Sequence, residues 1–485
     1  MSGAVADKKR LLRVTPGNYR NNHIYLTGHH DFFPPESIGQ SSRKKGVGDG
    51  ISIVLDGLGR EIQTDIGVDA KTGKPRKFFR GRTWVREFFE KHSIQPGDVL
   101  ALERTSETRY RLYPFETKSD RCDSWQEFAD NPPKGTGPTV LELFAGCGGM
   151  ALGFQRAGFR NTICKESDPA ACENIRQNIT ERVAQCAVEE IERFPKADVV
   201  AGGPPCQGFS NLGERVPHDP RNQLWRQYVR AVQDAKPRVF VLENVPPLLK
   251  SQEYVELVKM LSSEGYTIEG RVLNAADYGV PQTRRRAIVI GVLNGEPTFP
   301  EPTHVDPTKR DLLSSTLPLW RTTRDAIGDL PSEPTEENWH IGRNPTPMSM
   351  ERYRCIPPGG NRWDLPPRLT PDCWKRKTKG GTDLFGRLWW DRPSVTIRTE
   401  FYKPEKGRYL HPEAHRPITH REAARLQGFP DDFDFQGKRI EVGVQIGNAV
   451  PPGLAEAIAR HLMKAHFTSS SVHHGSRARR KIGAR

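Results

Sequence analysis

The chain has 485 residues, enough for two or three domains. It carries 73 Lys and Arg against 59 Asp and Glu, and the resulting formal charge of +14 favours an anionic partner. No apolar stretch approaches the roughly 20 residues that span a bilayer, and residues 1–10 lack the apolar core of a secretory signal. These features exclude a helical membrane protein and predict a soluble, cytoplasmic one.

The cysteine pattern gives no sign of a metal site or a disulfide framework. The eight cysteines form no CxxC pair, and none lies with histidines at the spacing of a zinc site. We therefore expect free thiols and no structural metal.

Residues 1–120 predict a β-rich N-terminal module. Short β-like runs at 51–55 and 98–102 alternate with turn signals, and apolar residues recur at helical spacing in 82–89. This part bears a weak resemblance to B3-type DNA-binding pseudobarrels.

Two basic stretches of this module, 43–45 and 74–77, suit contacts with phosphates, although solvated loops explain such runs equally well. A linker at 121–138 follows, and its end is rich in Pro and Gly.

From Thr139 the pattern changes to strands that alternate with helices. A predicted strand at 139–144 leads into the glycine-rich turn 145–150 and a helix at 151–158, an order typical of Rossmann-like nucleoside sites. The turn lacks the GxGxxG spacing of pyrophosphate sites, so a purely structural tight turn is an alternative. Glu166 ends the next predicted strand. Its carboxylate is placed to bind a ribose hydroxyl, and a solvated loop carboxylate is the alternative interpretation.

The segment 202–210, GGPPCQGFS, presents a cysteine directly after a short buried strand at 197–201. Two prolines stiffen this loop, so Cys206 would project from the carboxyl end of the sheet, where open α/β folds bind ligands. A lone cysteine is more often a small buried hydrophobe. The position of Cys206 instead favours a nucleophile.

The next predicted strand, 237–242, ends at Glu243. A thiol and a carboxylate on adjacent strand ends suit attack on a ring carbon with protonation of a ring nitrogen. Downstream, Gln282, Arg284 and Arg286 alternate along an extended segment and should share one face, where arginines hold a phosphate or a base edge.

Together, these residues make the chain over about 139–466 resemble the DNA cytosine-5 methyltransferase family. Six family motifs occur in the family's order, at 144–149 (FAGCGG), 204–207 (PPCQ), 243–245 (ENV), 282–286 (QTRRR), 392–397 (RPSVTI) and 445–452 (QIGNAVPP). The resemblance implies an α/β fold with a Rossmann-like S-adenosylmethionine-dependent core at 139–293 and a small irregular target-recognition region at 294–390. It also implies C-terminal motifs at 391–467 that return to the core. A basic tail at 468–485 is expected to be disordered.

The resemblance also implies a mechanism. The Cys206 thiolate would add to carbon 6 of a cytosine flipped out of the duplex. Glu243 would contact ring N3, Arg284 and Arg286 would hold the base, and Gln282 and Ser210 would bind substrate. S-adenosylmethionine would supply the methyl group, and no metal would be needed.

The same resemblance assigns cofactor contacts to Phe144, Gly146, Gly148, Glu166, Pro204 and Asn448. One position departs from the family: Ala187 stands where an acid usually precedes the nucleophile strand. The group that reads the adenine amino group is therefore open at this point.

The implied function is sequence-specific methylation of double-stranded DNA by a bacterial, nucleoid-associated monomer. It would protect DNA from a cognate restriction endonuclease, a functional rather than a physical partner. Two alternatives remain, a tRNA cytosine-5 methyltransferase and a catalytically silent DNA-binding regulator.

Overall fold

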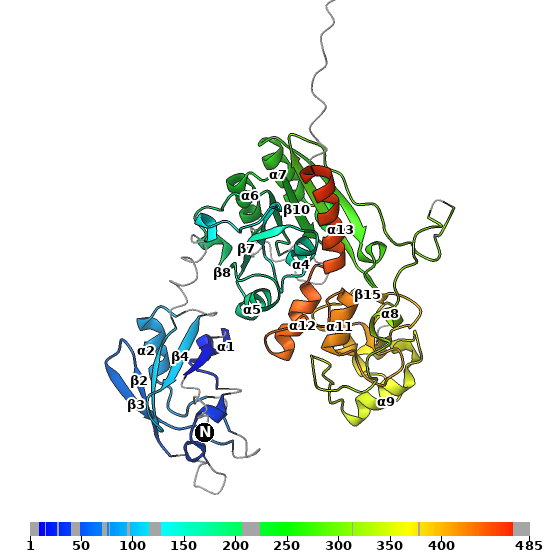
Figure 1. Cartoon of the computed structure of the whole chain (residues 1–485). Helices are drawn as coiled ribbons and strands as arrows, with labels where there is room; N and C mark the ends of the chain where they lie inside the picture. Colours follow the sequence, from blue (N-terminus) through cyan, green and yellow to red (C-terminus); the bar gives the residue numbers. More distant parts are fainter. Residues whose placement is uncertain are drawn as a thin grey trace, which may run out of the picture. The chain divides into compact units, whose positions relative to one another are not determined.

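A computed structural model describes residues 9–14, 16–26, 29–39, 49–69, 75–76, 78–94, 98–115, 128–205, 224–312, 314–376 and 379–468. The chain divides into two compact units, Met1–Asp120 and Arg121–Arg485, called here the first and second unit. Each is described by itself (Figure 1). Within the described ranges, no helix is both long and apolar enough to cross a membrane.

The first unit is built on a five-stranded sheet in the order β1-β4-β5-β2-β3. The strands are β1 (Lys9–Arg13), β2 (Ile51–Leu55), β3 (Arg60–Thr64), β4 (Val99–Arg104) and β5 (Arg109–Pro114), and the longest described helix is α2 (Trp84–Lys91). Alternate residues of β2 point inward, and four aromatic or apolar residues of α2 are buried. These side chains share one hydrophobic core.

Ion pairs neutralise several arginines on this sheet. Arg60 pairs with Glu87, Arg109 with Glu61, and Arg111 with Asp56. The basic stretch 43–45 lies outside the described residues, as do 74 and 77 of the second stretch. Phosphate contact by this unit therefore stays a prediction, and so does its resemblance to pseudobarrels.

The second unit contains a seven-stranded sheet in the order β11-β13-β10-β9-β6-β7-β8. Its strands are β6 (Thr139–Leu143), β7 (Arg160–Glu166), β8 (Val183–Gln185), β9 (Val199–Gly202), β10 (Val239–Asn244), β11 (Tyr266–Asn274) and β13 (Arg285–Leu293). Only β13 is antiparallel to its neighbours, which are β10 and β11. The chain order reverses between β6 and β9, and ligands bind beyond the carboxyl ends of strands at such a switch point.

Helices cover both faces of this sheet because the strands are apolar on both sides. Leu141 and Leu143 of β6 pack with α6 (Leu224–Ala235) and α7 (Gln252–Ser262). Val140 packs on the opposite face with α4 (Gly149–Arg156) and α13 (Pro452–Leu462). Figure 1 shows α4 and α13 side by side. A Cβ on Gly153 would lie 2.5 Å from that of Ala455, so glycine permits this approach.

Residues between β13 and the last helices form short elements. They are α8 (Thr323–Ile327), α9 (Pro347–Cys355), α10 (Asp372–Lys375), β14 (Gly386–Arg387), β15 (Ser394–Val395) and β16 (Arg408–Leu410). Their strands make only two-stranded sheets, β14 with β16 and β15 with β12 (Gln282–Thr283). The buried Arg387 guanidinium donates to carbonyl groups that include those of Tyr353, Ile356 and His411. Such bonds replace the regular ladders that are missing here.

The chain then returns to the sheet. The two-residue strand β12 (Gln282–Thr283) pairs in parallel with β15, and α11 (His420–Gln427), α12 (Arg439–Asn448) and α13 follow. The predicted fold class is confirmed, since a Rossmann-like α/β sheet and a β-rich N-terminal part are both present.

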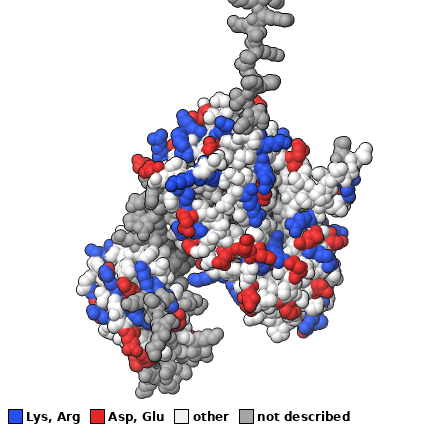
Figure 2. All heavy atoms as spheres, viewed as in Figure 1, with Lys and Arg blue, Asp and Glu red and all other residues white. Residues whose placement is uncertain are grey.

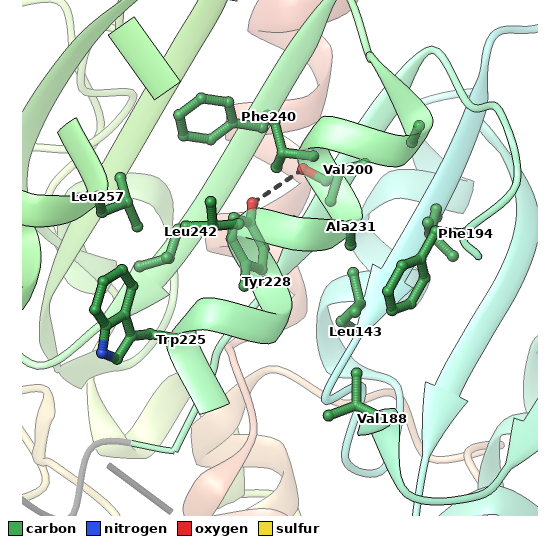
Figure 3. Packing of buried hydrophobic residues seen from close by; sticks show 14 of the residues in the cluster. Leu143, Val188, Phe194, Val200, Trp225, Tyr228, Ala231, Phe240, Leu242 and Leu257 are labelled. Atoms are coloured by element: carbon green, nitrogen blue, oxygen red, sulfur yellow. Dashed lines mark hydrogen bonds between the residues drawn. The ribbon is translucent and has the colours of Figure 1, made fainter. Parts of the chain in front are cut away.

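Tyr228 of α6 sits against the centre of the sheet, as Figure 3 shows. Its hydroxyl lies 3.2 Å from the carbonyl oxygen of Val200 and 2.8 Å from that of Val241, which belong to β9 and β10. The side chain is fully buried, and burial raises the pKa of its phenol. The hydroxyl therefore acts as a donor that fastens α6 to two strands.

We expect Tyr228→Phe to lower the free energy of unfolding by about 1–2 kcal/mol, because the ring is kept while a buried hydrogen bond is lost. Urea unfolding monitored by circular dichroism measures this. Tyr254→Phe is the control, since no hydrogen bond of its hydroxyl is found among the described residues. Equal stability of the two variants would show that the Tyr228 hydroxyl contributes nothing.

Candidate functional site

A cavity of about 810 Å³ opens at the carboxyl ends of β6, β7, β9 and β10. The glycine turn after β6 and residues 165–168 at the end of β7 form one side, and α12 with the residues after it forms another. The cavity therefore lies at the switch point of the sheet, where the sequence motifs predicted ligand contacts.

Most of the predicted site residues line this cavity. They are Phe144, Gly146, Glu166, Pro204, Glu243, Arg284, Arg286 and Asn448. Gly148 and Gln282 do not line it. Cys206 and Ser210 lie outside the described residues, which end at Pro205 and resume at Leu224.

Glu166 is held rigidly at one end of the cavity. One carboxylate oxygen accepts a hydrogen bond from the backbone N–H of Gly146, at 2.8 Å. The other accepts from the N–H groups of Ser167 and Asp168, at 2.7 and 2.9 Å. A carboxylate has about four acceptor sites, so Glu166 can still receive hydroxyl groups of a ligand.

Phe144 lies next to this carboxylate and begins the glycine turn. Its φ of 56° is left-handed, a conformation that is uncommon for a bulky residue and marks a strained turn. The Lys165 ammonium lies 5.4 Å from the centre of the Phe144 ring, within reach of a cation–π contact. The turn thus presents an aromatic ring to the cavity in a fixed orientation.

At the other end of the cavity, Glu243 pairs with Arg286. The Glu243 carboxylate lies 2.9 Å from the Arg286 guanidinium, and both side chains are largely buried, with exposed fractions of 11% and 15%. The next residue, Asn244, donates from its amide to the carbonyl of Pro204, at 3.0 Å. The end of β10 is thereby tied to the loop that continues to Cys206.

Gln282 and Arg284 contact the protein interior. The Gln282 side chain accepts from the backbone N–H of Ile397 and donates to Gln427. Arg284 donates to the carbonyls of Ile397 and Gly447, each at 3.0 Å. Burial, with a smaller effect of the Arg286 charge, lowers the pKa of Arg284 to about 9, so it stays charged at neutral pH.

The sequence analysis missed Glu142, an acid in the middle of β6 that lines the cavity. Its side chain is buried, and its Oε2 has no hydrogen-bond partner. Burial, reinforced by the nearby Glu166 carboxylate, raises the pKa of Glu142 well above its ordinary value. An acid inside the otherwise apolar run 139–144 was the only signal available in the sequence.

The position that departs from the family, Ala187, lines the cavity together with Val188 and Glu189. Val188 begins a short 3-10 helix, and its carbonyl accepts from Arg230 at 3.0 Å. Glu189 is exposed. A carboxylate therefore stands two residues beyond the alanine, on the same wall.

No cluster of three or more His, Cys, Asp or Glu suited to a metal ion occurs among the described residues. Six of the eight cysteines lie in those ranges, and all six are free thiols. Among these six, Cys147 belongs to the glycine turn itself. Burial raises the pKa of its thiol to about 12.

Comparison with known proteins gives consistent matches to the second unit. Residues 139–464 match the model of the C-5 cytosine-specific DNA methylase family. The chain is 38% identical to the type II methyltransferase M1.HphI of Haemophilus parahaemolyticus over 67% of this chain and 87% of that protein. It is 34% identical to M.Eco47II of Escherichia coli over 75% and 89%.

A solved structure matches as well. It is a prophage-encoded E. coli protein described as a candidate DNA modification methyltransferase, and it is 26% identical with a TM-score of 0.50. The match covers 68% of this chain and 99% of that protein.

We expect Arg284→Met to lower the free energy of unfolding by about 3 kcal/mol, because two carbonyls lose a charged donor and are left buried. Arg285→Met is a matched control on the adjacent, exposed side chain and should change stability by less than about 0.5 kcal/mol. Urea unfolding of both variants compares them. A shift of the same size in both would contradict the interior role of Arg284.

Proposed function

Because the chain belongs to the C-5 cytosine-specific DNA methylase family and is a DNA cytosine-5 methyltransferase, we propose that it methylates a flipped-out cytosine through a covalent adduct of Cys206. The observation that carries this proposal is the Glu243–Arg286 pair, which sits beside Pro204 at the end of the cavity. Pro204 precedes Cys206 by two residues in the sequence, and the proposed chemistry needs a thiol and a carboxylate at the same base.

The family uses S-adenosylmethionine, and the cavity fits this molecule in size and chemistry. Its volume lies within the range of cofactor sites. Glu166 offers a fixed carboxylate for ribose hydroxyls, Phe144 offers a ring, and Asn448 is an exposed amide in the cavity wall. When bound, S-adenosylmethionine supplies the methyl group. Glu189 is the carboxylate we assign to the adenine amino group in place of the acid missing at Ala187.

The proposed roles divide the chemistry between the cavity residues and Cys206. The Cys206 thiolate adds to carbon 6 of cytosine, and carbon 5 of the ring then takes the methyl group. Loss of the carbon 5 proton then breaks the bond between carbon 6 and sulfur and frees the thiolate. Glu243 contacts N3, where it stabilises the proton that the ring gains during attack. Arg286 holds the Glu243 carboxylate in place, and Arg284 acts as a positioning residue because its Nη1 and Nη2 donate to backbone carbonyls.

DNA is the substrate, and the chain's positive charge favours phosphate contacts. On the face drawn in Figure 2, however, Lys and Arg are interspersed with acidic side chains, and acidic groups gather across the middle of the second unit. We infer that residues 294–390 select a short sequence, since loops rich in Arg and Gly suit groove contacts.

We further propose that the enzyme protects DNA from a restriction endonuclease of the same specificity. The relatives M1.HphI and M.Eco47II are type II methyltransferases. We propose that the protein acts as a monomer in this role.

We expect the purified protein with S-adenosylmethionine to methylate cytosines of a plasmid library in one recurring sequence on duplex DNA. Bisulfite sequencing of both strands identifies the protected cytosines. Cys206→Ser should abolish the methylation, because serine is a far weaker nucleophile than a thiolate at neutral pH.

A DNA duplex with 5-fluorocytosine in that sequence provides the control. The wild-type enzyme should be trapped on it covalently, whereas Cys206→Ser should bind without forming an adduct. Methylation of tRNA alone would move the activity to RNA. Failure to methylate either nucleic acid would instead support a regulator.

Gly203→Ala tests the Glu243–Arg286 pair without replacing either of these two residues. An added Cβ would lie 3.0 Å from Oε2 of Glu243, the carboxylate oxygen opposite the one that pairs with Arg286, so the carboxylate must shift by a few tenths of an ångström and its pairing with Arg286 should weaken. We expect methyl transfer to fall by about ten- to a hundredfold with little change in the melting temperature. Gly50→Ala, whose Cβ would meet only an ordinary contact at 3.6 Å, should keep full activity. Unchanged activity of Gly203→Ala would separate this pair from catalysis.

A further inference from the structure

Lys165 is a buried cation that reaches the cavity. It is the penultimate residue of β7 and is only 3% exposed, yet it lines the cavity. Within the described ranges its Nζ has neither an ion pair nor a hydrogen bond, and it lies 5.4 Å from the centre of the Phe144 ring. A buried charge without a partner is costly, so the protein bears this cost at a position that a ligand can reach.

The register of the sheet decides which side of the cavity Lys165 faces. Lys165 pairs with Leu143 of β6 and with Ala184 of β8. Paired residues of neighbouring strands point to the same face, and both partners belong to the hydrophobic cluster on the side of α6. Three apolar residues of the cavity wall belong to this cluster or pack against it: Phe144, Val188 and Leu224. The cation therefore stands beside an apolar part of the wall.

An ammonium group beside an apolar wall suits an aromatic ring that carries lone pairs. The ammonium has three donors and no acceptor, so its partner must accept hydrogen bonds. Glu166, the next residue, is the carboxylate proposed for the ribose hydroxyls, and Ala187, which follows β8, lines the cavity as well. Adenine is attached to that ribose. It is planar, and its ring nitrogens N1, N3 and N7 are acceptors.

We propose that Lys165 recognises the adenine of the methyl donor by donating a hydrogen bond to one of its ring nitrogens. This inference rests on the proposed binding of S-adenosylmethionine in the cavity. It accounts for the alanine at position 187, because a cation at the ring nitrogens supplies recognition that the missing acid does not. With Glu189 assigned to the amino group, the base meets a donor and an acceptor of opposite charge.

Isothermal titration calorimetry with S-adenosylhomocysteine and 5′-methylthioadenosine tests this contact without catalysis. Both ligands contain adenine, and only the first has an α-carboxylate. Lys165→Met keeps an unbranched apolar side chain and removes the ammonium. It should weaken the binding of both ligands about ten- to a hundredfold, as expected for the loss of a charged hydrogen bond. Lys259→Met, an exposed position of α7 outside the cavity lining, is the matched control and should bind both ligands as the wild type does.

Deaza analogues of 5′-methylthioadenosine identify the nitrogen. In the 1-deaza, 3-deaza and 7-deaza forms, one ring nitrogen is replaced by C–H. One analogue should bind the wild type about tenfold more weakly than the parent nucleoside does. The same analogue should bind Lys165→Met as well as the parent does, because the contact is already missing there. Equal losses in both proteins would assign that nitrogen to another donor and would overturn the proposal, as would three analogues that all bind the wild type like the parent.

A second readout needs no ligand. Because the Lys165 ammonium has no polar partner in the free protein, Lys165→Met should melt at the same temperature as the wild type or at a higher one. A lower melting temperature of the ligand-free variant would show that the ammonium serves the fold rather than a ligand, and this would overturn the proposal.

The two ligands also separate adenine from the other acceptor of the donor. Weaker binding of S-adenosylhomocysteine alone to Lys165→Met would place the ammonium at the α-carboxylate and would overturn the adenine contact. Unchanged binding of both ligands would overturn it too. Absence of any binding to the wild type would instead remove the proposed cofactor site, and this inference with it.

Discussion

One buried guanidinium holds together the parts of the chain that enclose the cavity. Arg284 lies between two short strand segments and donates to the carbonyls of Ile397 and Gly447, which are more than a hundred residues away along the chain. The second carbonyl belongs to α12, and α12 forms a wall of the cavity. Charged donors bind carbonyls more strongly than neutral ones. The cavity therefore depends on contacts that Arg284 makes with the backbone of two distant segments.

Three carboxyl groups around that cavity differ in the hydrogen bonds and charges that surround them. Glu166 is ringed by backbone N–H groups, Glu243 is paired with Arg286, and Glu142 has no partner. Hydrogen bonds and a nearby cation favour the charged form of an acid, whereas burial favours the neutral form. The same type of side chain thus meets three different environments around one cavity.

The region from 294 to 390 is stabilised by side-chain hydrogen bonds more than by regular secondary structure. It has few regular hydrogen bonds, and buried Arg387 and Arg408 bind carbonyls from several loops instead. A guanidinium has five donors in a planar fork, so one side chain can fix several turns.

The sequence by itself determined the alternation of strands and helices after Thr139 and the order of the six motifs, because apolar runs and glycine turns are local patterns. Most of the site residues that it named line the cavity. The tertiary structure alone decided how Gln282, Arg284 and Arg286 divide their contacts, since regular alternation predicts a shared face but not which distant carbonyls or carboxylates meet it. It also decided that Glu142 is buried and unpartnered. Burial depends on the strands and helices that pack over a residue, and neighbours along the chain do not specify them.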